Sequence, residues 1–477
     1  MEASGGLPRP ALTGTATAEV VVVGGGIAGM CTAWELTRAG HDVMLLDAGR
    51  IMSGVTGHTT AKLTAQHTLI YHRLEPETAL FYAQAQTDAL KHVAAQPIEC
   101  ELERLPAYTY SSNLDEIKQE AEAARKAGLP ASYETSVPLP GASGAAVKVE
   151  GQAQFHPLRY LRGLAADLPR IHENTRVVDI DGRTVKTEQG ATVQAEVVVV
   201  ATHFPILDRV ALVPRLSPRR ELVLAAPIDK SLDPQGMYIT RDEGMRSVRT
   251  APYGDKRLLI VTGEIYPPGA PGVRQRIATL ANWAGERFGV TEFPYAWSAQ
   301  DYETSDGVPY VGRFPGMGDN VFVATGFGGW GMTNGVAAGR LIASLVAGEP
   351  LPWANIFDPR RITLKEAVTG VARNVAATAR HFIGDRVETQ RAEALSDIAP
   401  GEGRVLMVDG ERLAIYRDPQ GGLRAVEGTC THMGCVVGFN DAEATWDCPC
   451  HGSRFDLDGS IVSGPALKPL TPHQVSE

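Results

Sequence analysis

Unbroken apolar runs predict the first domain of the chain. Residues 19–23 read Glu-Val-Val-Val-Val, and residues 42–47 read Asp-Val-Met-Leu-Leu-Asp. A strand that is buried on both faces of a parallel sheet has apolar residues at nearly every position. The segment between the two runs has helical character and ends at Ala39-Gly40. The pattern therefore predicts a strand, a helix and a second parallel strand, which is the repeating unit of a doubly wound sheet.

Similar runs recur far along the chain. We predict further strands over 175–180, 193–202 and 321–325, and a helix over about 333–347. Short connections and buried parallel strands are typical of one α/β sheet, even when its segments are distant in sequence. The fold class that we expect is a doubly wound, Rossmann-like α/β domain.

The intervening segments have a different pattern. Residues 75–127 are rich in Ala, Glu and Gln and favour helices, whereas residues 215–300 contain short apolar runs bounded by Pro and Gly, which favour strands. We assign both to a second, mixed α+β domain interleaved with the first. Residues 351–386 are predicted to be a linker with an amphipathic helix over 362–383, which packs against the first domain in preference to touching a membrane. From residue 387 the chain is predicted to be all-β.

Composition and charge narrow the function classes. At about 150 residues per domain, the 477 residues predict roughly three domains. No run of about 18 apolar residues predicts a membrane span. The net charge of -10 argues against nucleic acid as the main partner, because phosphate binding needs a basic face. Residues 1–18 lack the pattern of a secretory signal. We expect them to form a flexible arm on a cytoplasmic protein.

A glycine motif follows the first predicted strand. Residues 24–29 read Gly-Gly-Gly-Ile-Ala-Gly. Glycines at this spacing let the backbone approach a pyrophosphate at a helix N-terminus, and an acidic residue at the end of the next strand accepts hydrogen bonds from a ribose. The sequence therefore predicts a dinucleotide site that consists of Gly24, Gly26, Ile27, Ala28, Gly29 and Asp47.

Residues 326–331, Gly-Phe-Gly-Gly-Trp-Gly, match the same motif formally. A separate NAD(P) site would need a second strand that ends in an acidic residue, and none follows this turn. We therefore interpret the turn as part of the first nucleotide's own site.

In this order, residues 24–29 with Asp47, 53–60, 197–202, 305–312 and 326–333 resemble the FAD-dependent amine and amino-acid oxidoreductases of the D-amino-acid oxidase and glycine oxidase superfamily. The resemblance covers about residues 18–350 and implies FAD, with a small-molecule substrate held over the isoalloxazine by the second domain. It implies FAD-binding segments at about 19–70, 150–210 and 305–350, and a substrate domain at about 75–150 and 211–304. The further FAD contacts that it implies are Ser53, Thr56, His58, Thr59, Val178, Thr202, Gly326, Gly328, Gly331, Met332 and Thr333.

One residue departs from this family's pattern and another leaves two alternatives open. Thr202 is followed by His203, where the family usually continues with Gly. The spacing of Ser53 and His58 is similar to the sarcosine and dimethylglycine dehydrogenase branch, in which the histidine is covalently bonded to the flavin. Alternatively, His58 is a polar residue near the cofactor without a covalent bond.

The strongest signal for a metal site lies near the C-terminus. Four of the six cysteines, at positions 430, 435, 448 and 450, fall within 21 residues, and His432 and His451 lie among them. Cysteine and histidine pairs in two turn-rich loops can bind the two irons of a [2Fe-2S] cluster asymmetrically. A zinc site is the alternative. It would use only four of these six potential ligands, so the pattern favours the cluster.

Residues 387–477 resemble a Rieske domain. The resemblance implies that Cys430 and Cys448 bind one iron and that His432 and His451 bind the other. It also implies a disulfide between Cys435 and Cys450, as in the Rieske domains of cytochrome complexes. From ligand chemistry we expect the ring nitrogens that do not bind iron to reach solvent.

Together the two sites indicate a dehydrogenase. FAD accepts a hydride from a carbon next to nitrogen, and a [2Fe-2S] cluster passes single electrons onward to an external acceptor. Two alternatives stay open: the cluster delivers electrons to FAD for reduction or hydroxylation of a substrate, or the chain is an electron-transfer or redox-sensing protein. The catalytic residues are not identified. We interpret His156 as structural, and the same holds for the potential substrate contacts Arg219, Arg220, Tyr253, Tyr266 and Trp330.

The residues beside the cluster motif predict a moderate redox potential. Ser453 retains a hydroxyl that can bond a cluster sulfide, whereas Phe455 stands where high-potential Rieske proteins have tyrosine. Loss of a hydrogen bond to the sulfurs lowers the potential. We expect a midpoint in the middle of the range of about -150 to +300 mV that Rieske centres span. A redox titration that gives a value at the upper end would contradict the role assigned to Phe455.

Acid precipitation of the pure protein distinguishes the two alternatives for His58. We expect the yellow colour to remain in the supernatant, as for a flavin that is held without a covalent bond. Colour that stays in the pellet after washing would instead show that the flavin is covalently bonded to the protein.

Overall fold

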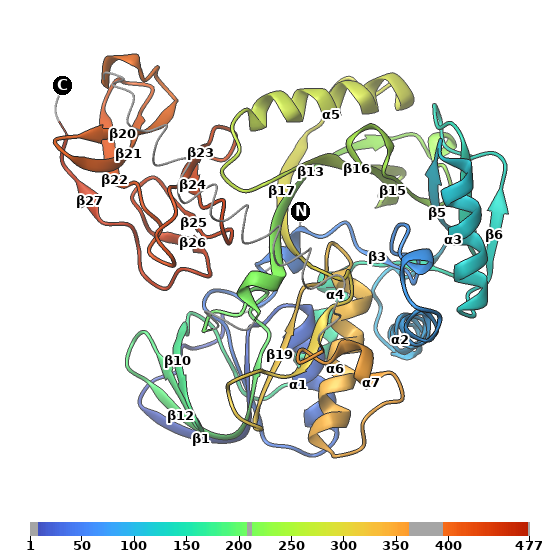
Figure 1. Cartoon of the computed structure of the whole chain (residues 1–477), viewed down its shortest axis with the longest axis horizontal. Helices are drawn as coiled ribbons and strands as arrows, with labels where there is room; N and C mark the ends of the chain where they lie inside the picture. The colour runs from blue at the N-terminus through green and yellow to red at the C-terminus, as the bar shows by residue number, and fades with distance from the viewer. Residues whose placement is uncertain (1–7, 208–211, 362–394, 476–477) are drawn as a thin grey trace.

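The computed structural model describes residues 8–207, 212–361 and 395–475. Two large sheets with their helices account for the chain up to residue 361, and a smaller all-β domain follows (Figure 1). The predicted fold class is confirmed: a doubly wound α/β domain, an interleaved mixed domain and a C-terminal β domain.

The first sheet is parallel at its centre. Strand β1 (Thr15–Val23) lies between β12 (Thr192–Val200) and β2 (Val43–Leu46), and β19 (Val321–Thr325) pairs with the end of β12. The four consecutive valines of β1 are at most 4% exposed, because both faces of the sheet are covered. The outer strands are β9 (Ile171–His172), β10 (Val177–Asp181), β11 (Thr184–Thr187) and β18 (Tyr310–Arg313).

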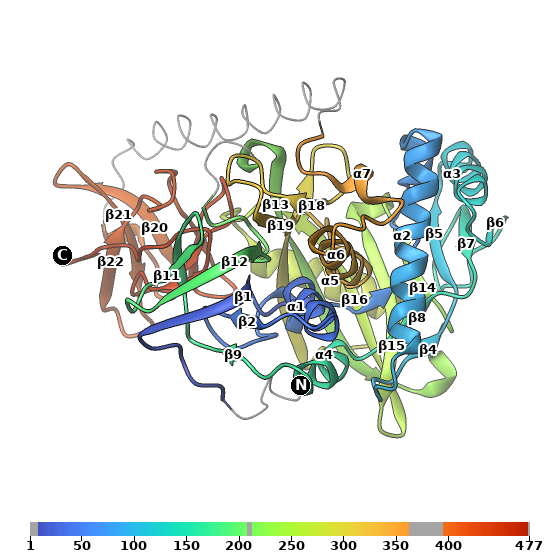
Figure 2. The same cartoon turned by 90° about the horizontal axis from the view of Figure 1, so that it is seen from below.

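Helices α1 (Ile27–Arg38) and α6 (Gly331–Val346) lie side by side on one face of this sheet (Figure 2). Small residues allow the close contact, since a Cβ atom on Gly339 would lie 2.7 Å from the backbone of Cys31. The other helices of this region are α2 (Pro76–Ala95), α4 (Pro157–Ala166) and α7 (Ala354–Phe357).

The second sheet is mixed and has eight strands. Helix α5 (Val273–Phe288) packs near one edge of this sheet, and α3 (Leu114–Lys126) packs near the other. The strands, in spatial order, are β17 (Tyr295–Thr304), β13 (Leu216–Ile228), β16 (Lys256–Tyr266), β15 (Arg246–Tyr253), β14 (Met237–Thr240), β5 (Ala107–Ser111), β7 (Ala145–Val149) and β6 (Ala131–Glu134). A small sheet joins the two parts through β3 (Lys62–Leu63), β8 (Ala153–Gln154) and β4 (Glu103–Arg104).

The C-terminal domain consists of two four-stranded sheets. Trp446, Phe455 and Leu470 have no exposed surface and form the centre of its core. One sheet contains β20 (Gly403–Val408), β21 (Glu411–Arg417), β22 (Leu423–Glu427) and β27 (Pro472–His473), and the other contains β23 (Gly438–Asn440), β24 (Thr445–Asp447), β25 (Arg454–Phe455) and β26 (Ile461–Ser463). Short 3-10 helices cover Val55–His58, Tyr71–Arg73, Val213–Arg215, Lys230–Leu232, Asp242–Gly244 and Leu395–Asp397.

Two expected boundaries differ from the structure. The expected flexible arm does not extend to residue 18, because β1 begins at Thr15 and the backbone N–H of Leu12 donates to Thr175 at 3.0 Å. The linker expected from residue 351 begins with packed chain: Trp353 is 1% exposed, and Arg361 forms an ion pair with Asp306. Both segments are held in place by buried side chains that length and composition do not reveal.

The amphipathic helix predicted over 362–383 lies outside the described residues. Within the part of the chain that the structure describes, no helix is both long enough and apolar enough to span a membrane.

Candidate functional site

A cavity of about 690 Å³ follows the carboxyl ends of the strands in the first sheet. This edge is where doubly wound sheets bind nucleotides. The cavity is lined by seven residues that the sequence predicts as cofactor contacts: Gly24, Gly26, Asp47, Ser53, Thr56, His58 and Thr202.

Two glycines of the motif are required by close contacts. Gly24 has φ +107°, and a Cβ atom there would lie 2.4 Å from the carbonyl oxygen of Ala201. A Cβ atom on Gly29 would lie 1.8 Å from the carbonyl oxygen of Gly24, so only glycine allows the helix to begin against the strand. Gly29 is therefore a packing residue and does not line the cavity.

Asp47 is held where the motif predicts. One carboxylate oxygen accepts from the backbone N–H of Gly25 at 2.7 Å, and the other accepts from that of Gly49 at 2.8 Å. Burial raises the pKa of Asp47, although these two hydrogen bonds oppose the shift. The glycine cradle, the N-terminus of α1 and this carboxylate fit a dinucleotide.

A narrower cavity of about 100 Å³, which we call the ring cavity, continues from the first. It brings the glycine motif together with the second glycine turn, because Gly26 and Ile27 line it along with Gly331 and Met332. This agrees with the interpretation that both turns serve one nucleotide. Ala28, Thr56, His58 and Thr59 complete the predicted residues in its wall.

Other predicted contacts lie outside the nucleotide and ring cavities. Gly326 packs against Thr304, where its Cβ atom would lie 2.4 Å away. Thr333 uses its hydroxyl within the protein, since it donates to the carbonyl of Thr64 at 3.1 Å. Val178 is not in the wall of the nucleotide cavity, but its neighbour Val177 is.

His58 lies in the walls of both cavities. Its Nδ1 lies 2.9 Å from the carbonyl oxygen of Gly54, and its own carbonyl accepts from the indole of Trp297 at 2.9 Å. These contacts hold the side chain and backbone of His58 beside the cofactor cavity and are compatible with both alternatives for this residue.

His203 has a left-handed backbone conformation, with φ +68°. Glycine adopts this conformation without strain, which explains why the resembling family usually has Gly here. The His203 ring lies in the walls of both cavities, and its Nε2 is 3.2 Å from Asp301. Asp301 also accepts from the backbone N–H of Gly329 at 2.6 Å. The histidine thus has partners that hold it beside the cofactor cavity.

A third cavity of about 90 Å³, which we call the substrate cavity, adjoins the ring cavity and is lined by both domains. Lys62 donates to Ser247 there, and Thr262 donates to Glu221. Burial lowers the pKa of Lys62 to about 8, an effect that Glu221 opposes. Gly328 and Trp330 line its opposite wall, together with Arg219, Arg241, Glu303 and Met332.

Four residues of these cavity walls are not predicted from the sequence: Lys62, Glu221, Asp301 and Arg241. The sequence offers local signals for two of them. Lys62 lies three residues after the expected contact Thr59, and Glu221 directly precedes the apolar run 222–226. Of the five potential substrate contacts, Arg219 and Trp330 line the substrate cavity. Arg220 and Tyr266 lie toward the C-terminal domain, and Tyr253 lines a separate cavity.

The cysteine and histidine loops of the C-terminal domain converge as the motif predicts. The thiols of Cys430 and Cys448 are hydrogen-bonded neighbours, and this bond, aided by the backbone N–H of His432, lowers the pKa of Cys430 to about 7. The rings of His432 and His451 have centroids 5.1 Å apart. His451 Nδ1 is buried without a hydrogen-bond partner among the described residues, which suits a metal ligand.

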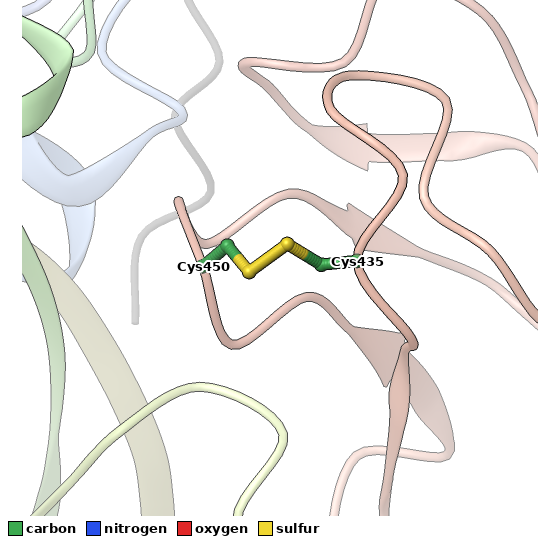
Figure 3. The surroundings of a disulfide bond; sticks show 2 residues. All are labelled: Cys435 and Cys450. Carbon is green, nitrogen blue, oxygen red and sulfur yellow. A yellow bond between two sulfur atoms is a disulfide. The ribbon is translucent and has the colours of Figure 1, made fainter. Parts of the chain in front are cut away.

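A disulfide joins Cys435 to Cys450 and ties the two loops together (Figure 3). Cys448 lies within 4.8 Å of both disulfide sulfurs. Because those sulfurs are bonded to each other, they are not available as thiolate ligands. The donor set that remains, two thiols and two imidazoles, fits the asymmetric ligation of a Rieske cluster.

The cluster histidines lie against Phe204 of the first domain and against β17 of the second. His432 is half-buried, and the burial of His451 differs from our expectation that the ring nitrogens reach solvent. His451 is 4% exposed, and the Phe204 ring lies 5.8 Å from its ring and 6.2 Å from that of His432. The Tyr302 hydroxyl donates to the carbonyl of His451 at 3.0 Å, and Gln300 donates to that of Gly452 at 2.8 Å. Docking of the C-terminal domain against the first two domains thus covers the edge that carries the histidine rings.

A buried ion cluster, which we call the Arg220 clasp, links β13 to the C-terminal domain. Arg220 is 1% exposed and donates at 2.7 Å to Asp447, the residue before Cys448. It also donates to Glu443, and Arg454 pairs with both carboxylates. Burial alone would raise the pKa of Asp447, but Arg454 and Arg220 outweigh it and lower that pKa.

A second contact joins α5 to the C-terminal domain. Asp441 accepts from the backbone N–H groups of Val273 and Arg274 at 2.8 and 3.2 Å, at the start of the helix. N–H groups in the first turn of a helix have no acceptor within the helix, and Gly272 at the N-cap has no side chain that could accept from them. Figure 1 shows this end of α5 beside β23.

Comparison with protein families identifies two regions. Residues 19–345 match the family model of the FAD dependent oxidoreductases, and residues 388–474 match that of the Rieske [2Fe-2S] domain. YhfW of Bacillus subtilis, named as a Rieske 2Fe-2S iron-sulfur protein, is 36% identical over 97% of this chain and 94% of its own. The cytochrome b6-f complex iron-sulfur subunit of Chlorobaculum tepidum is 36% identical over 17% of this chain and 44% of its own.

Solved structures share the fold of the first two domains. The L-proline dehydrogenase of P. horikoshii matches with a TM-score of 0.59 and 18% identity, over 74% of this chain and 98% of its own. The glycine oxidase of Geobacillus kaustophilus matches with a TM-score of 0.59 and 21% identity, over 73% of this chain and 100% of its own.

The Arg220 clasp leads to a prediction about how the C-terminal domain separates from the rest of the chain. Arg220→Met leaves Asp447 and Glu443 with Arg454 as their only cation in the clasp. Removal of one partner from a buried ion pair costs about 3–5 kcal/mol. We expect a lower temperature for the loss of the cluster's visible circular dichroism. Because the pKa of Asp447 is lowered, the clasp stabilises above the ordinary pKa of aspartate and weakens as the pH falls below it.

Arg219→Met is the matched control, since Arg219 lies on the same strand but lines the ring and substrate cavities. It should leave the melting of the cluster signal unchanged. If the cluster signal of the Arg220→Met variant is lost at the same temperature as that of the wild type, the stabilising role of the clasp is contradicted.

Proposed function

Because the chain belongs to the FAD-dependent oxidoreductase family and carries a C-terminal Rieske domain, we propose that it is a dehydrogenase for a small amine or amino acid. FAD, when bound, supplies hydride acceptance from a carbon next to nitrogen, and the Rieske cluster supplies one-electron transfer. Electrons then leave singly through the cluster to an external acceptor. The names of two structural neighbours, L-proline dehydrogenase and glycine oxidase, agree with this substrate class.

The observation that carries the proposal is that one segment and one strand connect the ring cavity to the cluster loops. His203 lines the ring cavity, whereas the next residue, Phe204, contacts the rings of both cluster histidines. On β17, Asp301 lines the same cavity and Tyr302 bonds the carbonyl of His451. Adjacent residues along each segment thus contact the two redox sites.

The substrate cavity has groups for both ends of an amino acid. Glu221 offers a carboxylate toward an amine, and Arg241 offers a guanidinium toward a carboxylate. Lys62, with its pKa lowered to about 8, can hold or release a proton near neutral pH. The wall formed by Trp330 and Met332 is apolar and suits a small hydrocarbon body.

Anaerobic rapid mixing of the holoprotein with a panel of amines and amino acids tests the proposal. We expect bleaching of the flavin, followed by the electron paramagnetic resonance signal of a reduced Rieske cluster. Glu221→Gln should slow the bleaching at least tenfold, since a hydrogen bond to a charged group contributes about 1.5–3 kcal/mol. Tyr302→Phe is the matched variant: it should slow cluster reduction several-fold and leave the bleaching unchanged.

The alternatives give different results in the same experiment. Flavin that is reduced only after the cluster has been reduced externally would support electron flow in the opposite direction. Failure of the whole panel would support an electron-transfer or redox-sensing role. Bleaching without any cluster signal would contradict the outlet through the Rieske domain.

A further inference from the structure

A second large cavity, of about 490 Å³, adjoins the sites described above through Ser53, His58 and Thr59, and we call it the rear cavity. It is enclosed by the hairpin of β15 and β16, by β17, and by the chain between β8 and α4. Segment 57–61 contributes to its wall and also to that of the ring cavity. The rear cavity shares this wall with the flavin site but has its own polar groups.

Arg249 is the principal polar group in the rear cavity. It is 6% exposed, and its Nη1 makes only long hydrogen bonds, of 3.3 Å, to the side-chain oxygen of Gln154 and the carbonyl of Thr250. Its Nε is buried without a partner among the described residues. Within the same residues, no carboxylate lies within ion-pair distance of Arg249. A buried cation in this state is costly, so the site favours an anion.

The carboxylates in the wall are already paired with other cations. Glu103 accepts from Arg257 at 2.7 and 2.9 Å, and Glu101 pairs with Arg159 at 2.7 Å. Burial lowers the pKa of Arg249 to about 10, even though Glu103 opposes the shift. The guanidinium is therefore the group in this cavity whose charge is least compensated by a direct contact.

The rest of the wall is apolar and aromatic. It is lined by Phe155, Leu258, Ile260 and Trp297. The indole N–H of Trp297 already donates to the carbonyl of His58. Tyr253 also lines it, with its hydroxyl 2.9 Å from that of Tyr295. Such a cavity suits a ligand with one anionic end and an apolar body.

We propose that the rear cavity binds a small organic monocarboxylate, with its carboxylate on Arg249 and its hydrocarbon part on the aromatic wall. A guanidinium presents paired N–H donors that match the two oxygens of one carboxylate. A phosphate dianion fits less well, because Glu101 and Glu103 line the same cavity. This site is distinct from the proposed substrate cavity and does not depend on the proposed function.

Calorimetric titration of the oxidised holoprotein with hexanoate tests the site without any turnover. We expect saturable binding that Arg249→Gln weakens at least tenfold. Arg249→Lys should give an intermediate affinity, because it keeps the charge but loses the paired donors, and it serves as the test if Arg249→Gln does not fold. Hexan-1-ol and inorganic phosphate should each bind at least tenfold more weakly than hexanoate.

Arg241→Gln is the matched control, because Arg241 lines the substrate cavity and not the rear cavity. It should leave hexanoate binding unchanged. The proposal is overturned if Arg249→Gln binds hexanoate as the wild type does, or if Arg241→Gln abolishes binding, which would place the carboxylate in the substrate cavity. Equal binding of hexan-1-ol or of phosphate would also overturn it.

Discussion

The alternation of side chains along β13 is the constraint on which the arrangement of both redox sites depends. Successive residues of a strand point to opposite faces of its sheet. Arg219 and Glu221 line the ring and substrate cavities, whereas Arg220 between them is buried against Asp447 of the Rieske domain. One strand therefore forms part of the wall of the ring and substrate cavities and also anchors Asp447, the residue next to the predicted cluster ligand Cys448.

Docking of the C-terminal domain against the rest of the chain explains features that no single domain explains alone. Phe204 covers the rings of the cluster histidines, and Asp441 of the Rieske domain caps the first turn of α5. The left-handed backbone of His203 is held within this interface by Asp301 and by Thr325, whose hydroxyl donates to the His203 carbonyl at 2.6 Å. Such local strain persists because its surroundings over-determine it. The docked arrangement therefore covers the histidine edge of the C-terminal domain.

Buried charges show which contacts are complete and which are available to a ligand. In the Arg220 clasp every carboxylate has a cation partner, which makes it a structural element. Lys62 and Arg249 differ, because burial lowers the pKa of both and the structure shows no ion pair for either among the described residues. Both line cavities. The ligand sites proposed above therefore lie at buried cations that have no ion pair among the described residues, whereas Arg220 and Arg454 of the clasp border the nucleotide cavity with their charges fully paired.

The sequence alone determined the fold class, the dinucleotide cradle and the Rieske motif with its predicted cluster ligands, because each depends on residues close together in the chain. Gly24 to Asp47 is one strand-helix-strand unit, and the four cluster ligands fall within 22 residues. Only the tertiary structure decided the rest. Lys62 and Asp301 come from distant segments and line the substrate and ring cavities respectively, and Glu221 lines both. The role of Arg220 follows from which face of β13 it occupies. A charged residue in a strand has no local signal for its face or its partner, because both are set by the packing of sheets and domains.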